Sequence, residues 1–193
     1  MRWPRRFVRD ERGIVLIEFA FVAPLFVLLL LAIIELGLTM LTQFTLDGAT
    51  RSAARLVRTG QVQAQGSPIT AFQNQLCAAL DGVIPTLSCN SGNVLFEVQD
   101  FPNGFASISF PPCTRNADQA GNGTACPFSP GTGGEVVGVR VSYARPFIIP
   151  WVGRCLTVGS CYLGLGSSPQ APLANSYTAN LVSTVVFQNE PFP

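Results

Sequence analysis

The chain has 193 residues, of which 48% are hydrophobic and only 12% are charged, about half the usual charged share. A net charge of +1 argues against a nucleic-acid-binding protein, and the absence of histidine excludes catalytic arrangements that need an imidazole. We therefore expect neither an enzyme nor a cofactor. Once a leader and an apolar helix are set aside, the remaining length suits one modest domain.

The chain begins with a basic leader, residues 1–13, which carries five arginines. An apolar run follows at residues 14–40, and its 27 residues would extend about 40 Å as a helix, enough to cross a hydrocarbon core of about 30 Å. The run is too long for a signal peptide, and no small-x-small cleavage motif follows it. We predict a transmembrane helix with a cytoplasmic N-terminus and an exported C-terminal part.

Glu18 is the residue of this run that needs an explanation, because it lies one turn inside the apolar stretch. A carboxylate costs a few kcal/mol at mid-membrane depth and usually has a partner there. Glu35 lies about 26 Å further along a helix, so we expect it at the opposite membrane interface, where a charge is unremarkable.

Residues 41–60 continue the helix with an amphipathic pattern. Arg51, Arg55 and Arg58 cluster on one face, which we interpret as solvated, with polyanion binding as the less favoured alternative. Asp47 precedes Arg51 by four residues, a spacing that predicts a helical ion pair. The opposite, apolar face consists of Leu46, Ala49, Ala53, Leu56 and Val57.

Gly60 gives a stop signal for this helix, and residues 61–193 form the predicted head. Ser67 and Pro68 predict the start of a second helix with an apolar stripe. Alternating apolar residues and turn signals then predict strands at 94–99, 105–110, 136–144 and 177–189, with loops at 111–134 and 145–166. The predicted fold class is α+β: a long N-terminal helix whose amphipathic half packs on an antiparallel sheet of three to five strands, with disulfide-clipped loops.

All six cysteines follow the apolar run: Cys77, Cys89, Cys113, Cys126, Cys155 and Cys161. Their even number and their position favour disulfides in an oxidising compartment. A metal site is disfavoured, because the chain has no histidine and no CxxC pair. Fifteen pairings are possible, and we predict the three neighbour pairs 77–89, 113–126 and 155–161.

The segment from Gly13 to Phe19, GIVLIEF, resembles the processing site of type IV prepilins. This resemblance implies cleavage between Gly13 and Ile14 by a prepilin peptidase, which leaves Glu18 as the fifth residue of the mature chain. The wider stretch EFAFVAPLFVLLLLAIIELGLTMLTQFTLDGATRSAARLVRTG resembles the TadE-like family of Tad (Flp, type IVc) pilus proteins, and the likeness covers roughly residues 12–60.

The family resemblance implies a minor pseudopilin that assembles or primes a Tad pilus used in adhesion and biofilm formation. The implied partners are a prepilin peptidase, other Tad pilins and pseudopilins, the inner-membrane platform of the pilus machine and membrane lipid. The implied location is the bacterial inner membrane, with the N-terminus in the cytoplasm and the head in the periplasm or outside the cell. Glu18, with Phe19 beside it, is then the contact to the N-terminus of a neighbouring subunit.

An alternative from another class is a membrane-anchored binding module, a surface receptor or adhesin that is not part of a pilus. Its site would lie in the loop 145–166, where Phe147, Trp151 and Tyr162 are expected to be exposed. A membrane-anchored metalloenzyme is a remote third possibility, since the chain has no histidine and few acids.

Overall fold

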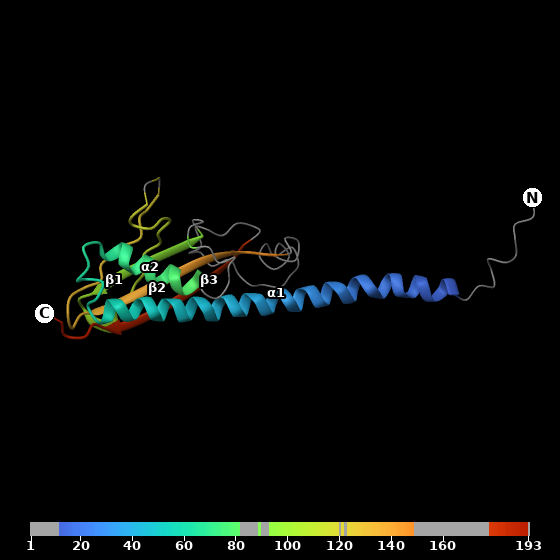
Figure 1. Cartoon of the computed structure of the whole chain (residues 1–193), viewed down its shortest axis with the longest axis horizontal. Coiled ribbons are helices and arrows are strands. Elements are labelled where there is room, and N and C mark those ends of the chain that lie inside the picture. Colours follow the sequence, from blue (N-terminus) through green and yellow to red (C-terminus); the bar gives the residue numbers. More distant parts are fainter. Residues whose placement is uncertain are drawn as a thin grey trace, which may run out of the picture. The chain divides into compact units, whose positions relative to one another are not determined.

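The computed structural model describes residues 12–81, 89, 93–119, 121, 123–148 and 178–192. The chain divides between Leu38 and Thr39 into two compact units, and each is described by itself. The described elements, in chain order, are α1 (Arg12–Arg58), α2 (Pro68–Asp81), β1 (Val94–Phe101), the 3-10 helix η3 (Gly104–Ser107), β2 (Val136–Pro146) and β3 (Thr178–Gln188) (Figure 1).

Helix α1 runs without interruption from Arg12 to Arg58 and includes Pro24. It ends two residues before Gly60, the stop signal that the sequence predicts, and the φ of 74° at Gly60 is the left-handed conformation that glycine adopts without steric cost. The N–H of Gly60 donates to the carbonyl of Val57 at 3.1 Å, which satisfies one of the carbonyls left over at the helix end. The long N-terminal helix is thus confirmed.

Helix α2 begins at Pro68, as its N-terminal sequence predicts. The hydroxyl of Ser67 contacts the hydroxyl of Thr70 at 2.8 Å, and the N–H of Ala71 donates to the carbonyl of Ser67. Three residues of the predicted stripe are completely buried: Phe72, Leu76 and Leu80. This stripe is the face by which α2 joins the core.

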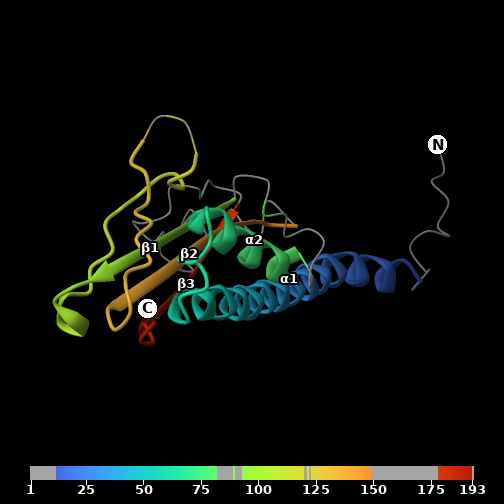
Figure 2. The ribbon, with the colours of Figure 1, turned by 60° about the vertical axis from the view of Figure 1, so that its left-hand side comes forward.

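The three strands form one antiparallel sheet in the order β1-β2-β3 (Figure 2). In its register Val98 lies opposite Val139, and Val139 lies opposite Val185 on the other side. The antiparallel sheet and the predicted α+β class are confirmed. The strand predicted at 105–110 is wrong, because Gly104–Ser107 forms η3 and the next residues are not in a strand.

The main core lies between the sheet and the two helices. Every second residue of the strands points into it, so that Phe96, Val139 and Leu181 meet the apolar faces of α1 and α2. Three aromatic rings extend the core, with the Phe72 ring 5.4 Å from that of Phe96 and 5.8 Å from that of Phe128. The residues of α1 that enter the core are Leu46, Ala49, Ala53, Ala54 and Val57.

The second face of β1 and β2 is covered by the segment that follows η3. Leu95 and Glu97, which alternation places on a solvent face, are therefore 6% and 1% exposed. The side chain of Asn116 supports this cover: its Oδ1 accepts from the N–H of Phe96 at 2.8 Å, and its Nδ2 donates to the carbonyl of Val94 at 3.0 Å. An asparagine side chain thus occupies part of the β1 edge that another strand would use.

Within the described residues of the head, two disulfides form, Cys77–Cys89 and Cys113–Cys126. The first ties α2 to Cys89, and the second closes the segment that covers β1. Both are neighbour pairs of the predicted kind. The predicted pair of Cys155 and Cys161 lies outside the described residues.

Candidate functional site

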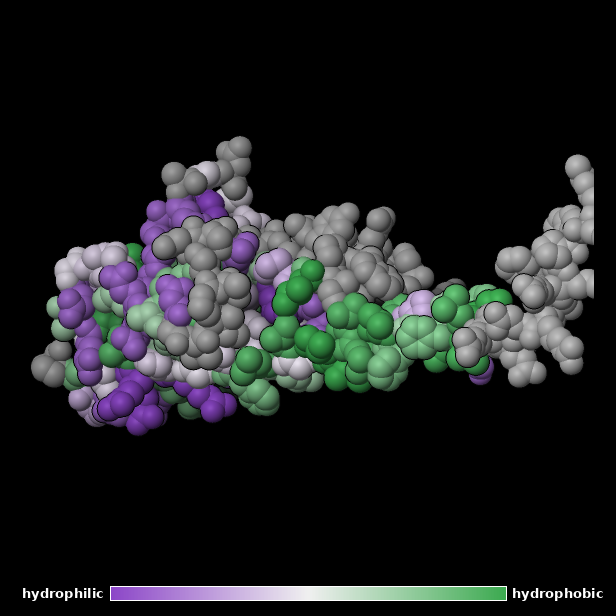
Figure 3. Space-filling model, turned by 45° about the vertical axis from the view of Figure 1, so that its right-hand side comes forward, coloured by the Kyte–Doolittle hydropathy of each residue, from purple (hydrophilic) through white to green (hydrophobic). Residues whose placement is uncertain are grey.

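The described residues of the first unit form an apolar helix and contribute no residue to a buried hydrophobic cluster. The side chains of α1 from Val15 to Ile34 are exposed or half-buried, and most of them are large and apolar. By length and composition α1 can cross a membrane. The hydrophobic surface of this helix is visible in Figure 3.

Glu18 is the one charged residue between Val15 and Ile34. Its side chain is exposed, and within the described part of the chain it has no hydrogen-bond or ion-pair partner. Phe19 beside it is 70% exposed. The helix therefore carries an unpaired carboxylate among apolar side chains. In hydrocarbon, such a carboxylate needs a partner.

The Gly13–Ile14 peptide bond lies in the first turn of α1, which begins at Arg12. Ile14 and Glu18 are four residues apart in α1, which corresponds to about one helical turn. The predicted processing and assembly residues therefore fall within the first two turns of α1, and the cysteines lie far from them in the chain.

Glu35 has a buried side chain. The sequence predicts that it lies at the depth of a membrane interface, and the structure adds that its side chain is only 1% exposed. It lies on the same side of α1 as Thr42 and Ala53, which are also buried. The helical period of 3.6 residues was the signal that could have revealed this, because it puts Glu35 on the buried face.

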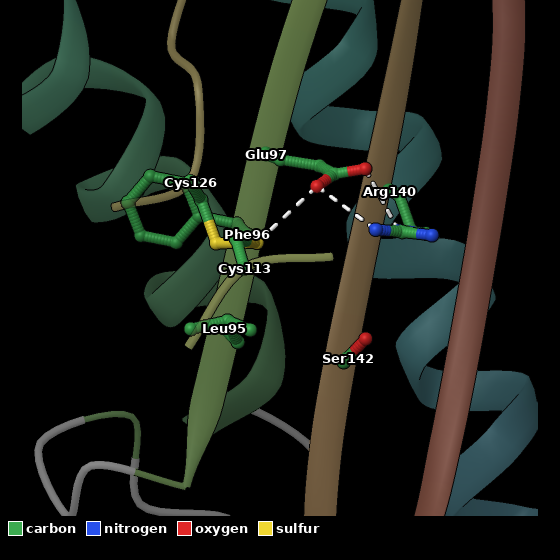
Figure 4. A pocket seen from close by; sticks show the side chains of 7 residues that line it. All are labelled: Leu95, Phe96, Glu97, Cys113, Cys126, Arg140 and Ser142. Carbon is green, nitrogen blue, oxygen red and sulfur yellow. Dashed lines mark hydrogen bonds and ion pairs between the residues drawn. A yellow bond between two sulfur atoms is a disulfide. The ribbon is translucent and has the colours of Figure 1, made fainter. Parts of the chain in front are cut away.

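The head contains a second candidate cluster of side chains, a buried ion pair beside a disulfide (Figure 4). Glu97 and Arg140 lie opposite each other on β1 and β2. Nε of Arg140 is 2.8 Å from Oε1 of Glu97, and its Nη2 donates to Oε2 at 3.0 Å. The guanidinium also donates to the carbonyl of Pro111 at 3.0 Å and lies over the Phe110 ring at 5.0 Å.

Burial dominates the electrostatics of this pair. It raises the pKa of Glu97 above its ordinary value of 4.5, while the charge and the hydrogen bond of Arg140 act to lower it. The net direction is upward, because the carboxylate is removed from water on the covered face of the sheet. Burial likewise raises the pKa of Tyr143, against the opposing effect of the Arg145 charge.

Glu97, Cys113 and Cys126 have the donor atoms of a metal site, all within 4.8 Å of one another. Both sulfurs belong to a disulfide, however, so neither is the thiolate that a metal needs, and Arg140 already neutralises the carboxylate. The sulfur of Cys113, 3.3 Å from Oε2 of Glu97, has no hydrogen to donate and only contacts it. The adjoining pocket has a volume of about 10 Å³, room for about one water molecule. We interpret the group as structural.

On the charged face of α1, the predicted ion pair does not form. Asp47 does not pair with Arg51; its Oδ1 accepts from Nε2 of Gln43 at 3.2 Å. The ion pair that forms joins Arg58 to Glu190 at 2.8 Å, which links the end of α1 to the C-terminal segment.

The alternative binding loop, residues 145–166, is described only up to residue 148. Phe147, expected to be exposed, is only 9% exposed, so it belongs to the packed head. Trp151 and Tyr162 lie outside the described residues. The described part of this loop therefore does not support a binding surface at Phe147.

A segment that matches a known family includes Gly13, Glu18 and most of the long apolar helix. Residues 13–55 match the family model of TadE-like protein. The TadE-like segment starts at Gly13, includes Glu18 and covers most of α1, and it associates the chain with Tad pilus proteins. No curated protein and no solved structure matches the chain.

Proposed function

We propose that this protein is a minor pseudopilin that takes part in assembling or priming a Tad pilus. A prepilin peptidase cuts between Gly13 and Ile14 and removes the basic leader. The mature chain then begins at Ile14 with Glu18 as its fifth residue. One observation carries the proposal: inside the TadE-like segment, a single unpaired carboxylate lies on an exposed apolar helix, one turn after the cleavage point.

Charge compensation is the physical reason for this arrangement. Cleavage creates a positively charged α-amino group at Ile14, which is as costly as Glu18 to bury in an apolar surrounding. If the amine of one subunit meets Glu18 of its neighbour, each neutralises the other. The apolar helix can then leave the lipid for the centre of a filament while its surroundings stay apolar.

The proposed partners follow from this sequence of events. They are the prepilin peptidase, the other Tad pilins and pseudopilins, the inner-membrane platform and the lipid that surrounds α1 before assembly. The head lies in the periplasm or outside the cell, where its disulfides form. Adhesion and biofilm formation are the roles proposed for the resulting pilus.

The processing step is tested by co-expressing the full chain with a Tad prepilin peptidase and determining its N-terminus. We expect Ile14 at the N-terminus of the wild type and an unprocessed chain for Gly13→Ala. Gly37→Ala is the matched control, because a Cβ at Gly37 meets no atom within 4 Å, and it should be processed normally. Normal processing of Gly13→Ala would contradict the proposal.

The assembly contact is tested with Glu18→Gln, which removes the charge and keeps the size of the side chain. We expect normal membrane insertion and processing but loss of incorporation into, or support of, the pilus, measured in sheared filament fractions. Asp118→Asn removes an exposed charge from the head and should leave assembly unchanged. Wild-type assembly by Glu18→Gln would rule out the intersubunit ion pair.

A further inference from the structure

We propose that the exposed face of α1 just beyond its membrane-spanning part is a docking surface for anionic phospholipid. In this proposal Met40, Leu41 and Phe44 lie in the interface of the outer leaflet, and Arg51 and Arg55 bind lipid phosphates. The inference rests on the proposed function in one respect: α1 must span the membrane with the head exported.

The length of the exposed apolar surface is the first support. Large exposed apolar side chains continue along α1 from Val15 to Phe44, which corresponds to about 45 Å at the helical rise. A hydrocarbon core is only about 30 Å thick, and the headgroups bring the bilayer to about 40–45 Å. The last turns of this apolar surface therefore lie in the headgroup region of the outer leaflet, or deeper if the helix is tilted.

The second support is that one helix face carries both the apolar and the basic residues. At 100° per residue, Met40, Phe44 and Arg51 point within about 40° of one another, and Arg55 follows Arg51 by one turn. All four are exposed, with Met40 at 60% and Phe44 at 71%. The opposite face, which includes Ala53, is the one buried in the core of the head.

Charge is the third support. Arg58 is paired with Glu190, but Arg51 and Arg55 have no ion-pair or hydrogen-bond partner within the part of the chain that the structure describes. On the same face, these two guanidinium groups follow Phe44 at about 10 and 16 Å along the helix, beyond the half-buried Asp47, whose carboxylate accepts from Gln43. This order matches a bilayer interface, where apolar side chains reach the acyl chains and arginine reaches the phosphates.

A second copy of the chain fits this face less well. If two parallel helices met along it, Arg51 and Arg55 of one copy would approach the same residues of the other, and like charges would repel. An anionic lipid surface instead complements both parts of the face. We therefore assign the face to lipid, and contact with a second copy becomes an outcome of the test.

The test uses the full chain in vesicles, with Trp3 and Trp151 replaced by Phe and a single Trp introduced at Phe26, Phe44 or Phe105. Phe26 lies within the spanning helix and is 57% exposed, and Phe105 on η3 is 58% exposed. Fluorescence is measured in vesicles whose lipids carry bromine either near the headgroup end or near the methyl end of the chain. The vesicles contain phosphatidylcholine with or without phosphatidylglycerol.

We expect Phe26→Trp to be quenched most by bromine near the methyl end, Phe44→Trp by bromine near the headgroup end, and Phe105→Trp by neither. Phosphatidylglycerol should increase the quenching of Phe44→Trp, and Arg51→Gln with Arg55→Gln should abolish that increase. Arg58→Gln is the control with the same substitution on the same helix, and it should retain the increase, because that arginine is already paired.

Three results would overturn the inference. If Phe26→Trp is quenched and Phe44→Trp is not, the anchor stands and the lipid-docking surface fails. If quenching of Phe44→Trp decreases as the protein-to-lipid ratio rises, a second copy covers this face. If Phe26→Trp itself is not quenched, both the anchor and this inference fail.

Discussion

Glu97 shows at the scale of one residue how burial and ion pairing compete. The carboxylate lies on a face of the sheet that the segment after η3 covers, and Arg140 across the strand pair supplies its counter-charge. Burial nevertheless prevails and leaves the pKa of Glu97 raised. A buried pair of this kind fixes the position of the covering segment, because Arg140 also holds the carbonyl of Pro111, but it is not a strong source of stability.

The raised pKa predicts the sign of a pH effect. A folded state with a raised carboxyl pKa binds the proton more tightly than the unfolded state, so the contribution of Glu97 to stability is present below its ordinary value of 4.5 and is lost as the pH rises through the folded value. Relative to Glu97→Gln, which does not titrate there, the wild type should therefore lose free energy of unfolding as the pH is raised from about 4 to 7.

Urea unfolding of the full chain in detergent micelles, followed for both proteins across this range, measures the difference. If the wild type instead gains stability over Glu97→Gln with rising pH, the ion pair lowers the pKa of Glu97 and the assignment is wrong.

At the scale of an element, α1 performs two tasks with two faces. Beyond Thr39 its small residues lie against the sheet, and Ala53 is completely buried. On the opposite face Gly48 is exposed, and a Cβ there would meet no atom within 4 Å. One helix therefore contains a tightly packed position and an open position five residues apart.

These two positions predict opposite effects on stability. Ala53→Leu forces a larger side chain into the contact between α1 and the sheet and should lower the free energy of unfolding by about 1–3 kcal/mol. Gly48→Ala removes the helix penalty of glycine and should raise it by about 0.5–1 kcal/mol. Urea unfolding in micelles measures both. A destabilised Gly48→Ala would show that this face is packed against something.

At the scale of the whole molecule, the two units are stabilised by different means. The described part of the unit up to Leu38 is an apolar helix that is mostly exposed and depends on its surroundings, whereas the unit from Thr39 has a buried core and both described disulfides. The Cys113–Cys126 bond closes a segment that Arg115 also holds, through its Nε, at the carbonyl of Gly123. Closing a loop of this size is worth about 3 kcal/mol in a chain-entropy model.

The two disulfides should therefore protect different parts of the chain. With Cys113→Ser and Cys126→Ser together, trypsin should cut the full-length protein after Arg115 much faster than it cuts the wild type. With Cys77→Ser and Cys89→Ser together, that cut should stay slow. Reducing gels and fragment masses report the site. Equal rates in the two double variants would mean that hydrogen bonds alone hold the Arg115 segment.

Local patterns in the sequence were sufficient to predict the features that depend only on neighbouring residues. The apolar run and Gly60 determine α1, and the stripe ending at Leu80 determines the buried face of α2. The alternation around Val139 determines the central strand. Each of these follows from a period of 3.6 or 2 residues within one element, and such periods can be read without knowing what the element touches.

Only the tertiary structure determines which faces of the strands are covered by segments from distant parts of the chain. Leu95 and Glu97 alternate with the core-facing residues of β1, and this pattern predicts that they face solvent. A segment more than ten residues away in the chain nevertheless buries them. Phe147 is buried and the 105–110 strand does not form, because pairing and packing partners come from distant parts of the chain. Amino-acid order specifies the faces of a helix or strand, but the long-range contacts of the fold determine what those faces meet.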